Sequence, residues 1–591
     1  MEPMQEIRMF ILGPYCYSDG QYRKELRKSL SDNDYVFTND DSTPNGILFT
    51  ELTWDNQYKL NIWDFGTIFG TSSVHLPFFS ENAVYLLAWD AKNGSSEDNI
   101  NEAKLKEWVR IIRNFGGTDS PIIIAVNCYS ANNPSKPAED QQKAIARLSD
   151  AYAGKLVDLL AVNYDEPDQV AIQALKTTIQ RRAEGLSNHM RKFAGLPKAR
   201  AWLDKKATES AVISYQEYWN YCEAENISNA KDIAIRLHNM GKILYFSKYD
   251  ELKQQIYLLP EKIVSQLYAV IRNRQRELRP ARERLNVCRL DEGTWISASC
   301  AYQVLAGLSM AFQERPNSNR YIVIDALSDG NPYREGELPH HVPIIARRYR
   351  YETLPPDIMN RIIALLHQYL EFYEGATQCW RRCARFRDEK EGANAIIRLH
   401  EAEKYLDVYV FGGNRLKFLK RIEADIERIN ESYNKEYISI SKRIPCTLQH
   451  TKTCPRQDCQ IDFPYDICYA KRNTGISIPC IESGSSNLSN SISELLGEPC
   501  SQEAELSIAN SNNSSSEQLD LDNQIKAEQL AGAQIERKSK EWSIAKERFL
   551  LWGAAIVAGT LLVLLCIGKI DLEELVNWFI ALADKLLKET Q

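Results

Sequence analysis

A glycine-containing turn follows the first apolar segment of the chain, in ILGPYCYSDGQYRKEL (residues 11–26). Phosphate-binding loops of the G-x-x-x-x-G-K-[ST] type use glycines so that backbone N–H groups can surround phosphate oxygens. Their lysine neutralises phosphate charge, and their Ser or Thr hydroxyl holds Mg²⁺. Gly13 occupies the first glycine position, whereas Ser18, Asp19 and Gly20 stand where the second glycine, the lysine and the hydroxyl residue are needed.

A two-residue insertion would bring Gly20 into the second glycine position. Gln21 and Tyr22 would then replace the lysine and the hydroxyl residue. The lysine is missing in both alignments, and in the first of them Asp19 places a negative charge beside a triphosphate. The turn is therefore predicted to have lost its affinity for phosphate.

The segment LNIWDFGTIFG (residues 60–70) has the position of the D-x-x-G motif that senses a γ-phosphate in GTPases. Asp64 and Gly66 are present, but Thr67 and Ile68 replace the closing glycine and the residue after it. Asp64 and Gly13 also fit a simpler explanation, because strand ends in α/β sheets favour turn residues.

Guanine recognition by an N-K-x-D motif requires an aspartate that accepts two hydrogen bonds from the base. The corresponding segment here begins with Asn127 and continues as Cys-Tyr-Ser, so this aspartate is absent. The S-A-K position reads Ala161-Val162-Asn163, and only the segment that begins at Thr43 still resembles switch I. With four elements altered together, we expect neither GTP nor GDP to bind with useful affinity.

Strands and helices alternate along residues 7–185, which predicts a mostly parallel sheet covered on both faces. The strands at 47–54 and 58–65 are so close that an antiparallel hairpin is expected. The order of elements is that of a Ras-like domain. The predicted strands are 7–13, 47–54, 58–65, 83–90, 121–127 and 156–163, and the predicted helices are 22–31, 99–115, 137–150 and 167–185.

Two further folded regions follow. Residues 213–275 are predicted to form two helices, two strands and a helix, which is a winged-helix arrangement, with Gly241 as a helix cap. Residues 297–437 return to a mixed α/β pattern. Its predicted helices are 356–374 and 414–432, and its predicted strands are 322–325, 345–351 and 404–411.

A cysteine cluster occupies residues 446–480. Cytosolic cysteines at this density commonly hold a metal, and four thiolates suit tetrahedral Zn²⁺. The spacing is not the paired CxxC of most zinc sites, so buried or surface thiols without a metal remain the alternative. The candidate structural zinc ligands are Cys446, Cys454, Cys459 and Cys480.

Residues 483–516 hold 12 serines and 5 asparagines and predict a flexible, disordered linker. Residues 549–568 form a run of 20 residues without a charge, long enough to cross the hydrocarbon core of a bilayer as one helix. A buried core helix is the alternative. Basic residues concentrate just before this run, which predicts a single-pass anchor with the N-terminal bulk in the cytoplasm.

Apolar residues recur at helical spacing in 570–588, among several acids. This pattern predicts an amphipathic helix at the membrane interface, with a partner-binding helix as the alternative. The first residues lack the basic and apolar segments of a secretory signal. The net charge of −7 gives no general affinity for nucleic acid.

The chain resembles the Roco family, whose members carry a Roc GTPase domain followed by a COR domain. LNIWDFGTIFG and VHLPFFSENAVYLLAWDA are similar to Roc sequences. Matches to the first COR subdomain lie in 213–271, including RLHNMGKILYF and the L-x-P before a helix. Residues 347–370 and CWRRC (379–383) are similar to the second subdomain.

The resemblance implies an α/β, Ras-like fold with degenerate GTPase motifs, followed by a COR domain that forms homodimers. The predicted domains are Roc-like 1–186, winged-helix COR-A 187–275, α/β COR-B 276–437, Cys-rich module 438–482, linker 483–516, juxtamembrane helix 517–548, transmembrane helix 549–568 and amphipathic helix 570–588.

The sequence therefore favours a membrane-anchored Roc–COR signalling scaffold that acts through an unknown protein partner rather than as an enzyme. A divergent GTPase, with a lysine such as Lys24 supplied from elsewhere, is the first alternative. A membrane-acting effector of a defence system is the second. The residues retained at nucleotide-binding positions are Gly13, Gly20, Thr43, Asp64, Gly66 and Asn127.

Overall fold

The structure is a computed structural model. It describes residues 5–13, 30, 47–54, 58–65, 72–90, 102–127, 129–130, 133–137, 139–162, 169–189, 193–277, 298–314, 321–330, 337–339, 342–373, 376–446, 461–474, 477–479 and 489–497. The chain divides into two compact units, Met1–Thr451 and Lys452–Gln591, and each is described by itself.

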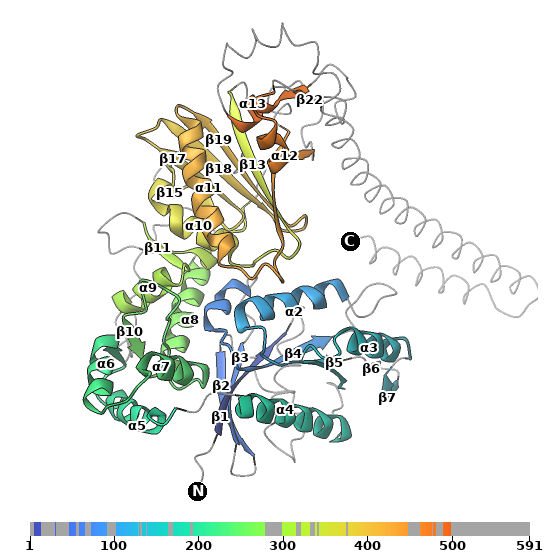
Figure 1. Cartoon of the computed structure of the whole chain (residues 1–591), viewed down its shortest axis with the longest axis vertical. Coiled ribbons are helices and arrows are strands. Elements are labelled where there is room, and N and C mark those ends of the chain that lie inside the picture. Colours follow the sequence, from blue (N-terminus) through green and yellow to red (C-terminus); the bar gives the residue numbers. More distant parts are fainter. Residues whose placement is uncertain are drawn as a thin grey trace, which may run out of the picture. The chain divides into compact units, whose positions relative to one another are not determined.

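The first domain of unit 1 is built on a six-stranded sheet in the order β2-β3-β1-β4-β5-β8 (Figure 1). β2 and β3 form the predicted antiparallel hairpin, and the other neighbours are parallel. This confirms the Ras-like strand order. The strands are β1 (Gln5–Leu12), β2 (Ile47–Trp54), β3 (Tyr58–Phe65), β4 (Val84–Asp90), β5 (Ile122–Asn127) and β8 (Val157–Ala161), with a small hairpin of β6 (Tyr129–Ser130) and β7 (Asn133–Pro137).

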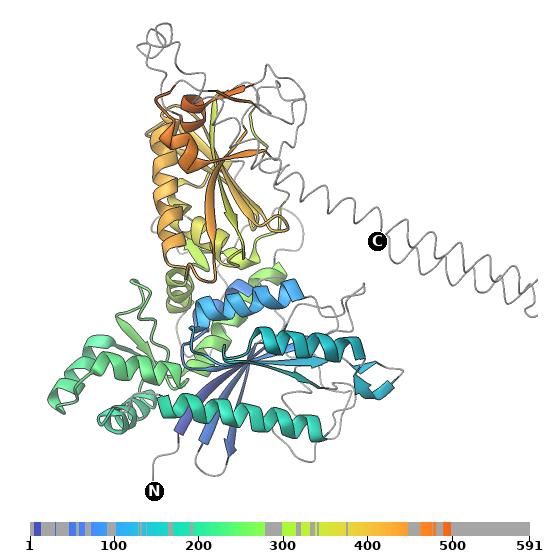
Figure 2. The ribbon, with the colours of Figure 1, turned by 45° about the vertical axis from the view of Figure 1, so that its right-hand side comes forward.

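Helices cover both faces of this sheet. α2 (Glu102–Gly116) and α4 (Gln169–His189) lie on opposite faces, as Figure 2 shows, and α3 (Glu139–Ala151) shares the α2 side. Apolar side chains such as Phe10 fill the α2 face and others such as Met9 fill the α4 face, because neighbouring residues of a strand point to opposite sides. Two short 3-10 helices, η1 (Ser72–Val74) and η2 (Leu76–Phe78), precede β4.

The second, helical domain contains α5 (Leu196–Ala207), β9 (Val212–Ser214), α6 (Tyr215–Ala224), α7 (Ala230–Asn239), β10 (Gln255–Tyr257) and α8 (Pro260–Glu277). The prediction placed two strands after the helical pair. In the structure β10 pairs with β9, which precedes α6. The segment between α7 and β10, where the first wing strand was expected, pairs with β10 only through an isolated bridge from Leu244 to Tyr257. The strand order predicted for the wing was therefore wrong.

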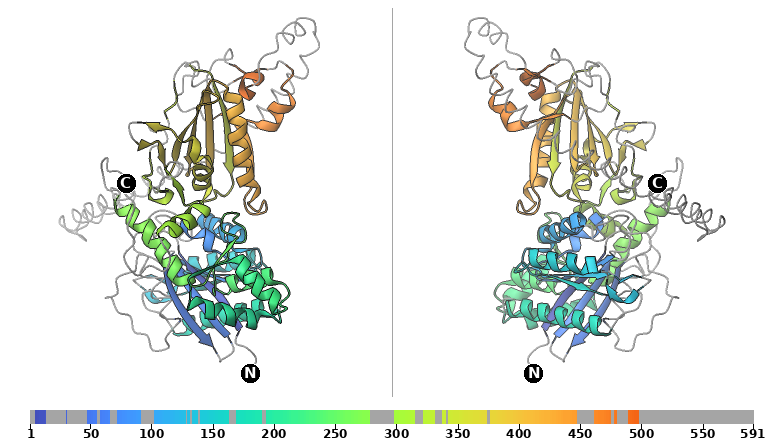
Figure 3. Two further views of the ribbon diagram at one scale, coloured as in Figure 1. Left: turned by 90° about the vertical axis from the view of Figure 1, so that its left-hand side faces the viewer. Right: turned by 90° about the vertical axis from the view of Figure 1, so that its right-hand side faces the viewer.

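A connector leads into the second sheet domain. It comprises α9 (Ala298–Gly307), β11 (Ala311–Gln313), β12 (Tyr321–Val323) and η3 (Ile324–Ala326). In the second sheet domain, strands run in the order β16-β17-β18-β19-β13-β20, and α11 lies along one face of the sheet (Figure 3). The elements are β13 (Ile344–Tyr351), α10 (Ile358–Leu366), η4 (His367–Tyr369), β14 (Phe372–Tyr373), β15 (Ala376–Thr377), β16 (Cys379–Trp380), β17 (Cys383–Asp388), β18 (Ala393–His400), β19 (Tyr405–Gly412), α11 (Arg415–Glu431) and β20 (Ile440–Pro445).

The helix predicted for 356–374 is shorter in the structure. α10 ends at Leu366, one turn of η4 follows, and the chain then enters β14. The buried side chains of α10, such as Ile362 and Ile363, pack into the core of the second sheet domain. The last of them is Leu366, where the helix ends. Tyr369 and Leu370 still pack against this core, but Phe372 and Tyr373 are exposed, so a helix extended to residue 374 would bury little more apolar surface.

In unit 2 the described elements are β21 (Asp462–Pro464), α12 (Tyr465–Ala470), β22 (Ser477–Pro479), β23 (Ser489–Ser491) and α13 (Ile492–Leu496). β22 pairs with β23. The prediction of a disordered linker over 483–516 is wrong for β23 and α13. Three apolar residues of α13, Ile492, Leu495 and Leu496, are buried and outweigh the polar composition around them.

The predicted helices at 517–548, 549–568 and 570–588 lie outside the described residues. Among the helices that are described, none combines the length and the apolar character needed to cross a bilayer. Membrane anchoring therefore stays a prediction from the sequence.

Candidate functional site

Three of the six predicted nucleotide-site residues lie at one edge of the first sheet. Gly13 follows β1, Asp64 is the next-to-last residue of β3, and Asn127 ends β5. The parallel register places Asp64 beside Ile11, so the carboxyl ends of these strands meet. In open α/β sheets this edge is where ligands bind. Gly20, Thr43 and Gly66 lie outside the described residues, and nucleotide contact by any of the six stays a prediction.

The predicted zinc ligands can be placed only in part. Cys446 follows β20 and is fully buried, whereas Cys454, Cys459 and Cys480 lie outside the described residues. Within the described part of the chain, no group of three or more His, Cys, Asp and Glu side chains is arranged to hold a metal ion. The zinc site thus stays a prediction.

The structure adds a buried polar cluster that the sequence analysis missed, where β1 and β3 meet the helical domain. Glu6 is 5% exposed and lies 2.5 Å from Arg200 of α5 and 2.7 Å from Lys242, which follows α7. The Asn61 amide donates a 2.6 Å hydrogen bond to the Met240 carbonyl. Burial alone would raise the pKa of Glu6, but the two cations outweigh it and hold the pKa below its ordinary value.

Arg8 lies on the same face of β1 as Glu6 and is completely buried. Its guanidinium lies 4.3 Å from the centre of the Trp63 ring, a cation–π arrangement. Burial lowers the pKa of Arg8 to about 9, so the side chain is charged at neutral pH. Among the described residues, its Nε and Nη2 have no hydrogen-bond acceptor.

Gly241 of the helical domain packs closely against the Arg8 side chain. Its φ of +80° is left-handed, and a Cβ there would lie 3.1 Å from the Arg8 Nε. Glycine thus permits both the helix end and the close approach of the two domains. Glu6 and Arg8, two residues apart in the mostly apolar strand QEIRMFIL, were the sequence signal for this contact, because they share one face of a buried strand.

Residues 72–79, which come after the D-x-x-G position, contact three other parts of unit 1. His75 and the Tyr268 hydroxyl of α8 are 2.6 Å apart, and their rings stack. Ser73 donates a 2.8 Å hydrogen bond to Asp325 of η3, and Asp325 also accepts one from Asn360 of α10. Ser73 and His75 are both buried. Residues 72–79 therefore link the first domain to the helical domain, the connector and the second sheet domain.

Helix α2 makes a second set of links to the second sheet domain. Arg110 lies 2.5 Å from Glu352 and Glu107 lies 3.0 Å from Lys404. The Asn114 side chain accepts a 2.7 Å hydrogen bond from the backbone N–H of residue 434, and Phe115 packs edge-on against Tyr433. These contacts fall on the residues that follow β13, precede β19 and follow α11, so α2 is fixed to three connections of the second sheet domain.

Three protein-family descriptions match the chain. Residues 34–129 match "Ras of Complex, Roc, domain of DAPkinase", residues 197–292 match "C-terminal of Roc, COR-A domain" and residues 342–498 match "C-terminal of Roc, COR-B domain". The first domain is accordingly called Roc below, the helical domain COR-A and the second sheet domain COR-B.

Two curated proteins are similar to much of the chain. A probable serine/threonine-protein kinase, pats1, of Dictyostelium discoideum is 22% identical over 460 residues, which are 73% of this chain and 13% of that protein. A Roc-COR-CHAT protease from an unknown prokaryotic organism is 20% identical over 397 residues, which are 64% of this chain and 35% of that protein. The chain thus spans only a minor part of either relative.

Among solved structures, the chain is similar to the RocCORdC fragment of Roco2 from Methanosarcina barkeri bound to GDP. The identity is 19%, the match covers 55% of this chain and 96% of that one, and the TM-score is 0.39. Roc, COR-A and COR-B follow one another along this single chain, and the protein belongs to the Roco family of Roc–COR proteins.

Proposed function

We propose that this protein is a membrane-anchored Roc–COR scaffold whose Roc domain is a pseudo-GTPase. It works through protein–protein contacts and COR-mediated homodimerisation rather than through nucleotide hydrolysis. The observation that carries the proposal is the absence of the phosphate-loop lysine, with Asp19 or Gln21 at its position. A triphosphate needs cations at this place, and a carboxylate or an amide supplies none.

The contacts of residues 72–79 support this proposal. In a switching GTPase the segment after the D-x-x-G motif must move when the γ-phosphate is lost. Here this segment is buried, and Ser73, His75 and Phe78 contact Asp325, Tyr268 and Phe246. Such contacts favour one constitutive arrangement of Roc and COR, in which the Roc sheet serves as part of a fixed interaction surface.

A divergent GTPase is the second candidate, because Gly13, Asp64 and Asn127 still meet at the carboxyl edge of the sheet. Lys24 would then have to neutralise the phosphates. In that case the Roc domain would retain a nucleotide-dependent role in signalling.

Nucleotide-dependent stabilisation distinguishes the two candidates. We expect GTP and GDP with Mg²⁺ to leave the melting temperature of the full chain unchanged. A divergent GTPase would gain about 2.7 kcal/mol of stability at roughly 100-fold the Kd. Thermal unfolding with each nucleotide, together with the nucleotide content of the purified protein, provides the measurement.

Lys24→Ala serves as the matched variant in this experiment. Should the wild-type chain be stabilised by GTP and the Lys24→Ala chain not, the pseudo-GTPase proposal is wrong and Lys24 supplies the missing charge. If neither chain is stabilised by GTP or GDP and no guanine nucleotide is released on denaturation, the proposal is supported.

The anchor is tested by placing charges in residues 549–568. We expect the full chain to remain in the membrane fraction after alkaline carbonate washing. Replacing Leu562 and Leu564 by arginine should release it, since each arginine near the centre of a span costs about 2.5–3.5 kcal/mol. The control, Leu562→Val with Leu564→Val, should remain in the membrane fraction. A wild-type chain found in the supernatant would refute anchoring.

A further inference from the structure

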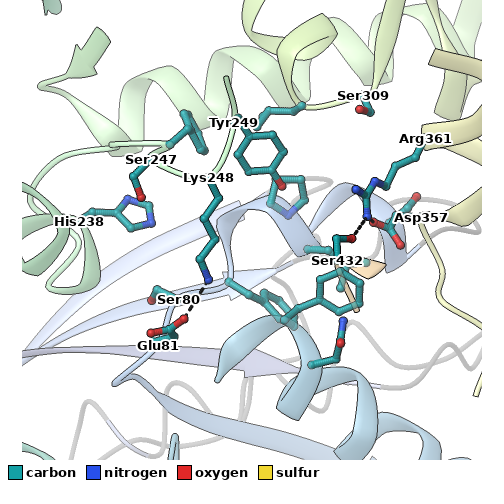
Figure 4. Close-up of a pocket in the computed structure, with 18 of the residues that line it drawn as sticks. Ser80, Glu81, His238, Ser247, Lys248, Tyr249, Ser309, Asp357, Arg361 and Ser432 are labelled. Atoms are coloured by element: carbon teal, nitrogen blue, oxygen red, sulfur yellow. Dashed lines mark hydrogen bonds and ion pairs between the residues drawn. The ribbon is translucent and has the colours of Figure 1, made fainter. Parts of the chain in front are cut away.

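A cavity of about 410 Å³ lies within unit 1, where Roc, COR-A and COR-B meet (Figure 4). Roc lines it with residues such as Ser80 and Phe115, COR-A with residues such as His238 and Tyr249, and COR-B with residues such as Arg361. Its volume lies within the range of about 300–1,000 Å³ that is usual for small-molecule sites. This cavity is separate from the carboxyl edge of the Roc sheet, because none of Gly13, Asp64 and Asn127 lines it.

The charges of the cavity are balanced in pairs. Lys248 lies 2.9 Å from Glu81, and Arg361 lies 3.8 Å from Asp357 while it donates a 2.7 Å hydrogen bond to Ser432. Each cation therefore has a carboxylate partner in the lining. A polyanion such as a triphosphate would meet both carboxylates, so the lining favours a ligand without net charge.

His238 adds no further charge. Burial and the nearby Arg8 lower its pKa to about 3, and its Nδ1 accepts a hydrogen bond from the backbone N–H of Tyr245. The ring is thus neutral at physiological pH and presents a polar but uncharged wall.

Aromatic rings and neutral polar groups make up most of the remaining lining. In Figure 4 the Tyr249 ring lies between Lys248 and Arg361, and Phe79, Phe115 and Tyr433 also line the space. Phe79 and Tyr433 are almost fully buried, whereas Tyr249 and Phe115 are partly exposed and can stack on a planar ring. The other groups include hydroxyls and a side-chain amide, among them Ser80, Ser247, Ser309 and Asn239.

One of these polar groups, Ser80, is buried without using its hydroxyl in the part of the chain that the structure describes. The Ser80 side chain is 3% exposed, and its Oγ has no hydrogen-bond partner among the described residues. The Ser80 backbone is satisfied by two hydrogen bonds with the Tyr85 hydroxyl, so the unused group is the hydroxyl alone. A buried hydroxyl without a partner is costly unless a bound molecule satisfies it.

We propose that this three-domain cavity binds a nucleoside, a molecule without net charge that joins a planar base to a hydroxylated sugar. The base would stack among the aromatic side chains, and the sugar and base substituents would bond to the serine and asparagine groups. Because all three domains contribute, an occupied cavity favours their docked arrangement over any arrangement in which they separate. This inference does not depend on whether the carboxyl edge of Roc binds GTP.

The test uses the full chain with adenosine and guanosine as probes and isothermal titration calorimetry as the readout. We expect at least one nucleoside to bind the wild-type chain. Ser247→Trp fills the cavity from a partly exposed position and should weaken binding at least about tenfold, equivalent to about 1.4 kcal/mol. The matched control is Ser228→Trp, on an exposed COR-A loop outside the cavity, which should bind like the wild type.

Tyr249→Leu provides a second variant, which removes the stacking ring without filling the space. Circular dichroism establishes that each variant is folded. Weaker binding by both cavity variants supports the proposal, and ribose alone should bind far more weakly than the nucleosides. The absence of binding to the wild-type chain would overturn the proposal, as would unchanged binding by a folded Ser247→Trp chain.

Discussion

Replacing Asp407 with alanine is expected to lower the free energy of unfolding of the second sheet domain by about 3–5 kcal/mol. Asp407 of β19 and Arg348 of β13 face each other across the sheet and form two hydrogen bonds of 2.7 and 2.8 Å. Both side chains are 2% exposed. The Tyr409 hydroxyl donates a further hydrogen bond to the same carboxylate. Alanine at 407 would leave a buried arginine without its carboxylate, and this accounts for the size of the effect.

Urea-induced unfolding, followed by intrinsic fluorescence, measures this change. The control is Glu225→Gln, which breaks the exposed pair of Glu225 with Lys198 at 3.3 Å. Exposed pairs contribute only about 0–1 kcal/mol, so the control should unfold almost like the wild type. A loss for Asp407→Ala no larger than that of the control would contradict the structural role of the pair.

The same pair predicts acid sensitivity. Burial alone would raise the pKa of Asp407, but Arg348 outweighs it and the pKa lies below its ordinary value. A carboxyl group whose pKa is lower when folded stabilises the fold fully above its unfolded pKa of roughly 3.9. That contribution disappears as the pH falls through the folded pKa. The difference in stability between wild type and Asp407→Ala should therefore shrink below about pH 4.

Trp63→Ala is expected to cost about 3–5 kcal/mol of folding stability. Trp63 is 1% exposed and packs edge-on against Phe10 and Phe49, with ring centres 6.0 and 5.0 Å away. Trp63 also contacts the buried guanidinium of Arg8, which would lose its cation–π contact as well as its packing. Thermal unfolding measures the change. Trp219→Ala, at a tryptophan that is 43% exposed on α6, is the control and should cost far less.

A double variant measures how much of the stability lost in Trp63→Ala comes from the contact between Trp63 and Arg8. Arg8→Met removes the buried charge, and an apolar side chain of similar length can replace it in an apolar site. We expect Trp63→Ala in an Arg8→Met background to cost at least about 0.5 kcal/mol less than in the wild type, as coupled neighbours do. Strictly additive losses would show that the cation–π contact contributes nothing.

The local pattern of apolar and polar residues was sufficient to predict most of the strands and helices of the Roc domain. The near-continuous apolar strands and the short connection between 47–54 and 58–65 predicted the parallel sheet and its hairpin, and the register confirms both. It was insufficient for COR-B, where β17 and β18 were not predicted. Their sequences, CARFRD and ANAIIRLH, interrupt the apolar pattern with arginines, and one of these, Arg398, lies 5.1 Å from the centre of the Tyr409 ring on the neighbouring strand β19.

The sequence by itself determined which residue types stand at the motif positions for phosphate and guanine, with Asp19 or Gln21 where a phosphate-binding loop has its lysine. It also placed Gly13, Asp64 and Asn127 at strand ends. Only the tertiary structure decided how the domains are joined. Asn61 is hydrogen-bonded to Met240, which is 179 positions away in the sequence, and Ser73 is hydrogen-bonded to Asp325, which is 252 positions away. Contacts over such separations depend on how folded domains pack, which no local pattern of residues specifies.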